Sequence, residues 1–86
     1  MFSIEFSNQA KKFLKNLDKH IFIRIIERIN NLKQNPVPSD AKFIGRHKND
    51  RVFRYRIGDY RTLYKIKEQN KVVLVVKIDK RAGVYD

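Results

Sequence analysis

The chain has 86 residues with 20 Lys and Arg against 9 Asp and Glu, and its lack of cysteine excludes disulfides and thiolate metal sites. A formal net charge of +11 on a single small domain, residues 1–86, favours an anionic partner: nucleic acid, an anionic membrane or an acidic protein. Two isolated histidines make a structural metal improbable, so we expect no metal or cofactor. We also expect a soluble cytoplasmic protein without membrane contact, because neither a spanning segment nor a signal-peptide pattern is present.

The first residues predict a strand followed by a short helix. Phe2, Ile4 and Phe6 alternate with polar residues, which is the period of a half-buried strand. Ser7 or Asn8 can cap the helix that follows. Its apolar residues recur at helical spacing: Ala10, Phe13, Leu14 and Leu17.

A second helix is predicted from about Lys19 to Lys33, capped by Asp18 and ended by Pro36 and Pro38. The two helices should form a hairpin. Ile21 and Ile23 fall off the apolar stripe, so they form either a docking surface for a partner or part of a wider stripe. The stripe itself comprises Phe22, Ile25, Ile26, Ile29 and Leu32.

Residues 35–50 have the composition of a loop, with a short apolar patch at Phe43 and Ile44. From Arg51 onward the apolar period is two, and the residues Gly-Asp at 58–59 predict a two-residue hairpin turn that begins with glycine. Residues 72–76 are apolar on both faces, as in an interior strand covered on both sides. The element order is therefore β-α-α-β-β-β.

These elements indicate an α+β fold. The economical arrangement packs the helical hairpin on one face of a mainly antiparallel four-stranded sheet. The apolar alternation places three tyrosines on the core face as packing residues: Tyr55, Tyr60 and Tyr64.

The hairpin turn also predicts a cluster of arginines on the opposite face. It pairs Arg56 with Arg61 and places Arg54 one side-chain step away, opposite Leu63. Like charges opposed in a sheet destabilise it, so the arrangement favours an anion, although a solvated basic face is the ordinary alternative. In the last strand, alternation puts Leu74, Val76 and Ile78 on one face and Val75, Lys77, Asp79 and Arg81 on the other. If Ile78 faces the core, Arg81 shares the face of the arginine pair.

Arginine suits a phosphodiester, because its planar fork of donors stays charged throughout a reaction. Tyr85 could stack on a base or act as a hydroxyl acid or base. His47 lies in a basic loop and is a weaker acid-base candidate, since a lone loop histidine is usually solvated. Further basic residues are candidate RNA contacts: Lys42, Arg46, Lys48, Arg51, Lys77 and Lys80.

The C-terminal half resembles that of the RelE/ParE toxins in three runs: Arg54-Tyr-Arg56-Ile-Gly-Asp-Tyr-Arg61-Thr-Leu-Tyr64, Val-Val-Leu-Val-Val-Lys-Ile and Lys80-Arg81-Ala-Gly-Val-Tyr85. With the β-α-α start, the resemblance covers essentially the whole chain, and the last run is similar to the RelE branch. It implies a RelE-like microbial RNase fold. It also implies a type II toxin that enters the ribosomal aminoacyl site and makes the 2′-hydroxyl of the messenger attack the adjacent phosphate.

The same resemblance implies the residue roles. Arg54 and Arg56 match catalytic basic positions that are often lysine, and Arg61 matches the phosphate-binding arginine. Arg81 matches the residue that protonates the leaving oxygen, and Tyr85 the substrate-orienting tyrosine. Arginine is a poor proton acceptor. Either Tyr85 takes the 2′-hydroxyl proton, therefore, or positioning and charge stabilisation carry most of the rate, which we prefer.

The resemblance leaves an alternative function open, a ParE-like inhibitor of DNA gyrase without RNase activity, since fold alone does not separate the two. A basic RNA-binding module without catalysis would explain the charge but not the convergent face. The implied partners are the ribosome with its mRNA and an acidic, RelB-like antitoxin in a hetero-oligomeric complex, whose amphipathic segment would cover apolar surface and neutralise charge.

Overall fold

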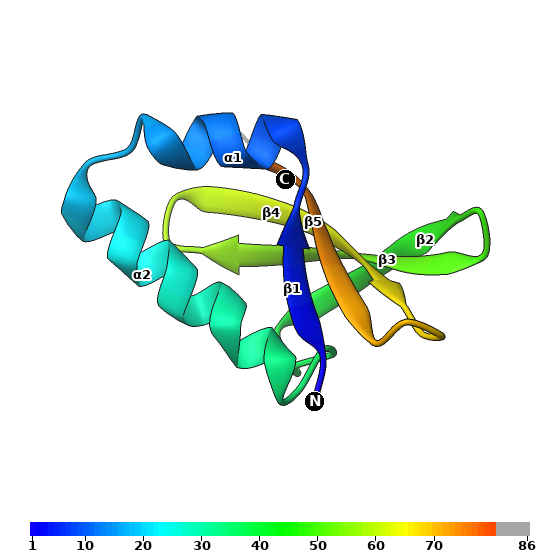
Figure 1. Cartoon of the computed structure of the whole chain (residues 1–86). Coiled ribbons are helices and arrows are strands. Elements are labelled where there is room, and N and C mark those ends of the chain that lie inside the picture. The colour runs from blue at the N-terminus through cyan, green and yellow to red at the C-terminus, as the bar shows by residue number, and fades with distance from the viewer. Residues whose placement is uncertain (81–86) are drawn as a thin grey trace.

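The computed structural model describes residues 1–80, which form two helices and one five-stranded sheet (Figure 1). The strand order is β1-β5-β4-β3-β2; β1 runs parallel to β5 and the other neighbours are antiparallel. The predicted α+β class is confirmed. The elements are β1 (Ser3–Phe6), α1 (Asn8–Lys15), α2 (Lys19–Asn30), the 3₁₀ turn η1 (Asn31–Lys33), β2 (Ala41–His47), β3 (Asp50–Ile57), β4 (Tyr60–Lys67) and β5 (Val72–Lys80).

The sheet has one strand more than the sequence predicts, because β2 occupies part of the expected loop at 35–50. Two features explain why the apolar periodicity of the sequence does not predict β2. The strand lies at the sheet edge and is largely exposed, so its apolar residues do not alternate. A bulge between Phe43 and Gly45 also shifts the register and leaves Ile44 as an extra residue, which interrupts the period of two at the apolar pair Phe43 and Ile44.

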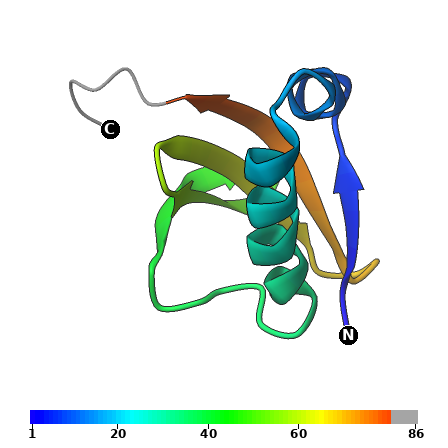
Figure 2. The same ribbon diagram turned by 90° about the vertical axis from the view of Figure 1, so that its left-hand side faces the viewer.

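Both helices pack on one face of the sheet, as predicted, and their termini follow the capping residues. Ser7 is the N-cap of α1, since its hydroxyl accepts a hydrogen bond from the Ala10 N–H at 3.1 Å. The second helix begins after Asp18, whose side chain makes no capping bond. Figure 2 looks along α1 and across α2, so the consecutive helices lie at a steep angle to each other.

The core lies between the helices and the inner face of the sheet. Ile21 packs against it, which supports the wider stripe, whereas Ile23 is 43% exposed and Phe22, expected to be buried, is 37% exposed. In the described part of the chain, no helix is long and apolar enough to cross a membrane. The buried core residues are Ala10, Leu14, Ile25, Ile29, Leu32, Phe53, Tyr55, Ile57, Tyr60, Tyr64, Ile66, Val73, Val75 and Ile78.

A bulge in β5 sets the face of every residue after it. Tyr64 pairs with Val75 whereas Leu63 pairs with Lys77, so Val76 is an extra residue. The Val76 carbonyl accepts a 2.6 Å hydrogen bond from the Ser7 hydroxyl, and Gln9 bonds both backbone groups of Ile78, at 2.9 and 3.0 Å. The start of α1 thereby holds the bulge in place.

The bulge changes part of the predicted alternation in β5. Ile78 is buried and Lys77 and Asp79 face outward, as expected. Val75, however, is buried on the core face, although simple alternation groups it with Lys77, and Leu74 lies on the opposite face, although alternation groups it with Ile78. The predicted interior position of β5 is confirmed, but helices cover only one of its faces.

Candidate nucleic-acid interface

The β3–β4 hairpin has the predicted turn and register. Gly58 has φ +59°, a conformation that favours glycine, and a Cβ at this position would collide with the Arg24 guanidinium of α2. The strands pair Ile57 with Tyr60, Arg56 with Arg61 and Arg54 with Leu63, as the turn predicts. The turn therefore fixes which arginines share a face.

Three of the five predicted catalytic residues share the face of the sheet that carries no helix, which we call the outer face. Arg54, Arg56 and Arg61 alternate with the buried residues of β3 and β4. Arg56 is exposed, and the other two are half-buried. The remaining two predicted catalytic residues, Arg81 and Tyr85, lie outside the described residues.

Like charges are paired twice on the outer face. Arg56 lies directly opposite Arg61, and Lys42 of β2 lies directly opposite Arg54. Leu63 of β4 separates Arg54 from a further cation, because it pairs with Arg54 on one side and with Lys77 of β5 on the other. Such pairs are destabilising in an isolated sheet, so the face gains stability when a polyanion approaches it.

One carboxylate on the outer face offsets part of this charge. Asp79 is the cross-strand partner of Arg61, and its two oxygens accept hydrogen bonds from Arg61 Nε at 3.2 Å and Nη2 at 3.4 Å. Lys77 Nζ lies 3.8 Å from the same carboxylate. The sequence placed Asp79 on this face but did not assign it a role. A two-oxygen pair fixes the plane of the Arg61 guanidinium, which orients the group for planar recognition of a phosphate.

The predicted RNA-contact residues divide between two surfaces. Lys42 and Lys77 lie on the outer face beside Arg54. Strand pairing places Arg46 and Arg51 on the opposite face, where Arg46 donates to the Asn49 carbonyl at 2.9 Å and Arg51 pairs with Glu68 at 2.7 Å. The other two are exposed: Lys48 in the β2–β3 turn and Lys80 beside Tyr60 at the end of β5.

His47 is separated from the arginine pair. It pairs with Asp50, six positions along β3 from Arg56, or roughly 20 Å. Its Nδ1 lies 3.4 Å from Lys65 Nζ. His47 therefore lies too far from the Arg56–Arg61 pair to act there as an acid or a base.

The core-face tyrosines have structural roles, as predicted. Burial raises the pKa of the Tyr64 phenol well above its ordinary value of 10.0, and its hydroxyl donates to the Pro36 carbonyl at 2.6 Å. Arg28 Nε donates a hydrogen bond to the Tyr55 hydroxyl at 3.2 Å. This bond is the main reason why the pKa of Arg28 lies above its ordinary value. Arg28 also pairs with Asp40 at 2.9 Å, which ties α2 to the segment before β2.

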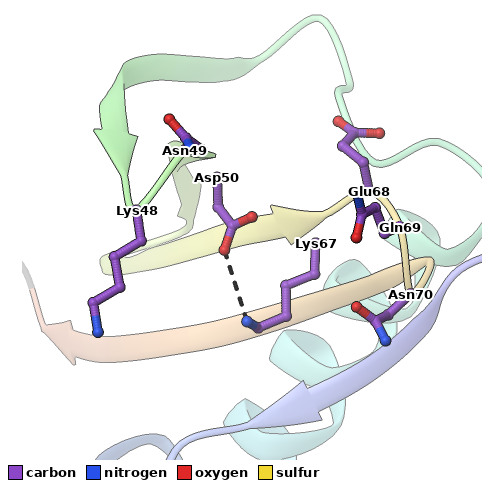
Figure 3. Close-up of a pocket in the computed structure, with 7 residues that line it drawn as sticks. All are labelled: Lys48, Asn49, Asp50, Lys67, Glu68, Gln69 and Asn70. Atoms are coloured by element: carbon purple, nitrogen blue, oxygen red, sulfur yellow. Dashed lines mark ion pairs between the residues drawn. The ribbon is translucent and has the colours of Figure 1, made fainter.

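A polar hollow of about 330 Å³ lies between the β2–β3 and β4–β5 turns, and it includes Lys48 (Figure 3). In Figure 3 the Asp50 carboxylate and the Lys67 ammonium group point toward each other, at 3.7 Å. Glu68 also lines the hollow, so its charges are balanced internally. It therefore lacks the excess of cations that marks the outer face. Within residues 1–80, His, Asp and Glu side chains form no group that could hold a metal ion.

The fold agrees with comparison to known proteins. Residues 4–85 match the family model described as the ParE toxin of a type II toxin-antitoxin system, parDE. The chain is 34% identical to the putative toxin RelE1 of Methanocaldococcus jannaschii, over 98% of this chain and 94% of that protein. It is 26% identical to toxin RelG of Mycobacterium tuberculosis, over 98% and 95% of the two chains.

Solved structures agree with this assignment. A RelE chain in the archaeal RelE-RelB complex of Pyrococcus horikoshii superposes with a TM-score of 0.84 at 27% identity, covering 94% of this chain and 96% of that chain. The RelBE2 toxin-antitoxin complex of Mycobacterium tuberculosis gives 0.76 at 26% identity, covering 93% and 98%. The fold and the matches define a toxin of a type II toxin-antitoxin system. The chain belongs to the RelE/ParE toxin superfamily, in its RelE-type branch.

Proposed function

We propose that the chain is a ribosome-dependent endoribonuclease that cleaves mRNA in the aminoacyl site and so inhibits translation. The observation that supports this most directly is the outer face, where Arg54, Arg56 and Arg61 gather with Lys42 and Lys77. Fixed guanidinium groups supply charge and planar donors to a phosphodiester without the need for a metal ion.

In the proposed reaction the 2′-hydroxyl oxygen of one nucleotide attacks the adjacent phosphorus and loses its proton to solvent, while the bond to the 5′-oxygen of the next nucleotide breaks and that oxygen takes up a proton. The products are a 2′,3′-cyclic phosphate and a 5′-hydroxyl. Negative charge increases on the phosphoryl oxygens between these events. The three outer-face arginines stabilise that charge, and the ribosome supplies an extended messenger. By resemblance, Arg81 lies at the leaving oxygen and Tyr85 orients the substrate. Because arginine exchanges its proton poorly, Arg81 stabilises the charge on the leaving oxygen. Lys77 and Lys42 hold neighbouring phosphates.

The proposed partner in the inactive state is an acidic, RelB-like antitoxin. Two observations support it: two of the matching structures were solved as RelE-RelB and RelBE2 complexes, and this chain carries a net charge of +11. Binding between such opposite charges should weaken with added salt.

Gyrase inhibition is the second candidate function, because the matched family model has the ParE description. One experiment separates the two. The purified protein is added to a defined mRNA with and without programmed ribosomes, the cuts are mapped, and gyrase supercoiling is assayed in parallel. We expect cuts within the aminoacyl-site codon only when ribosomes are present. Inhibition of gyrase with intact mRNA would overturn the nuclease proposal.

A variant test examines the two roles assigned by resemblance alone. Arg81→Ala combined with Tyr85→Ala should relieve growth arrest while the folded state and antitoxin binding persist. A fully toxic double variant would contradict those roles.

A further inference from the structure

The first turn of α1 pairs with β5 beyond the point where β1 stops. β1 pairs with β5 only as far as Phe6 and Val75, so within residues 1–80 the next part of β5 has a strand on one side alone. The Gln9 side chain occupies the open side: its Oε1 accepts from the Ile78 N–H at 3.0 Å, and its Nε2 donates to the Ile78 carbonyl at 2.9 Å. One amide therefore pairs with both backbone groups of a β5 residue, as a residue of a neighbouring strand would.

Ser7 holds the same stretch of β5 at the bulge. Its backbone N–H donates to the Val75 carbonyl at 2.9 Å, and its hydroxyl donates to the Val76 carbonyl at 2.6 Å. Together with the bonds of Gln9, these contacts attach β5 to α1 before and after the extra residue, where α1 lies across the end of the strand (Figure 1).

The bulge decides which side chain lies opposite Arg61. Tyr64 pairs with Val75. If this register continued without the extra residue, Ile78 would lie opposite Arg61; the bulge brings Asp79 there instead. Burial of Ile78 favours the same arrangement, but burial sets only the face on which a side chain lies. The hydrogen bonds from α1 hold the backbone of this strand end at one position.

The position of this backbone matters because Asp79 orients Arg61. Its two carboxylate oxygens accept from Arg61 Nε at 3.2 Å and Nη2 at 3.4 Å, which fixes both the direction and the plane of the guanidinium. Asp79 directly follows Ile78, the residue that the Gln9 amide holds. A shift of the strand end therefore moves the carboxylate and the guanidinium together, and a misplacement of about 1 Å at a reacting centre can cost on the order of 100-fold in rate.

We propose that Gln9 is a positioning residue for the phosphate-binding Arg61. Its amide holds the backbone at Ile78, this backbone fixes Asp79 on the outer face, and the carboxylate in turn orients the guanidinium toward the scissile phosphate. The inference rests on the nuclease function proposed above. Because α1 packs on the face opposite the arginines, Gln9 acts through β5 and not on the RNA.

Single-turnover cleavage of a defined mRNA on programmed ribosomes tests the proposal with Gln9→Ala. Gln9 is exposed, so water can replace its amide and the variant should stay folded, which thermal unfolding checks. We expect the maximal cleavage rate to fall about tenfold and the ribosome concentration at half-maximal rate to change by less than about twofold, because the orientation of one group changes and the number of cations does not.

The matched control is Gln69→Ala in the exposed β4–β5 turn, which should cleave at the rate of the unmodified chain. Equal rates for Gln9→Ala and Gln69→Ala would overturn the proposal. Gln9→Glu keeps the acceptor for the Ile78 N–H but loses the donor to its carbonyl, and it replaces Gln9→Ala in every comparison if that variant proves unfolded.

A double variant distinguishes positioning from a general loss of stability. Asp79→Asn alone should slow cleavage about tenfold, because it leaves Arg61 less well oriented. Adding Gln9→Ala to Asp79→Asn should slow it by no more than about a further twofold, since changes within one hydrogen-bonded chain of residues are not additive. A full additional loss of about tenfold would show that Gln9 acts by a route other than Asp79 and would refute the proposal.

NMR reads the orientation of Arg61 without any need for activity. The Arg61 Nε–H signal, assigned by its absence in Arg61→Lys, should move in Gln9→Ala in the same direction as in Asp79→Asn and stay in place in Gln69→Ala. A signal that does not move in Gln9→Ala would contradict the proposal. If the unmodified chain cuts no mRNA, the nuclease function fails in the ribosome assay, while the NMR result still decides whether Gln9 positions Arg61.

Discussion

Replacing Asp79 by Asn removes the carboxylate that pairs with Arg61 and leaves the Arg56–Arg61 pair with less compensating charge. The two pairing side chains are each 30% exposed, so solvent weakens the interaction without abolishing it. A favourable cross-strand charge pair contributes about 0.2–1 kcal/mol. The loss of the second cation contact, with Lys77 at 3.8 Å, brings the expected destabilisation to about 1 kcal/mol.

For a domain of this size, that loss corresponds to a fall in Tm of about 4–8 °C in thermal unfolding at low salt. The matched control is Asp59→Asn in the exposed hairpin turn, which changes the net charge equally. It should alter stability by less than about 0.5 kcal/mol. The gap between the two variants should narrow in 1 M salt, where the Debye length is about 3 Å. Equal Tm values for the two variants at low salt would refute the pairing argument.

Three further substitutions test the scaffold by denaturant or thermal unfolding. Thr62→Val should stabilise the fold by about 1 kcal/mol, because the buried hydroxyl has no hydrogen-bond partner among residues 1–80; a destabilised variant would contradict this. The pKa of Tyr64 is raised in the folded state, so its contribution to the free energy of unfolding should be full below pH 10 and decrease as the pH rises further. Tyr64→Phe should lower the free energy of unfolding by about 1 kcal/mol at pH 7, because it removes the hydrogen bond to the Pro36 carbonyl, and should make the decrease at alkaline pH smaller. Gly58→Ala should cost about 1–2 kcal/mol, because φ +59° disfavours a residue with a Cβ, and Arg24→Ala should recover the part that comes from contact between the added Cβ and the Arg24 guanidinium; an unchanged free energy of unfolding in Gly58→Ala would contradict this.

The arginine face could be predicted from sequence because a local signal fixes it. Gly58 and Asp59 form a two-residue turn, and such a turn sets the register of both flanking strands. Alternation then assigns each side chain to a face. Arg56 and Arg61 could be paired on this basis without any long-range information.

The features that the sequence did not predict depend on contacts far apart in the chain. The β5 bulge is held by Ser7 and Gln9, almost seventy residues earlier, and a continuous run of valine and leucine at 72–76 carries no alternation that would reveal it. The edge strand β2 buries too few side chains for apolar and polar residues to alternate along it. The Arg61–Asp79 pair likewise depends on the register that follows the bulge.

The central claim is that the outer-face arginines, and not the basic charge in general, act on the scissile phosphate. Single-turnover cleavage of mRNA on programmed ribosomes tests it most directly, with Arg56→Ala and Arg61→Ala compared with Arg46→Ala and Arg51→Ala on the opposite face. We predict that each outer-face variant slows cleavage by about 10²–10³-fold, as expected for loss of a charge-stabilising donor, while the opposite-face variants remain within about threefold of the unmodified chain. Equal losses in the two sets would contradict the account.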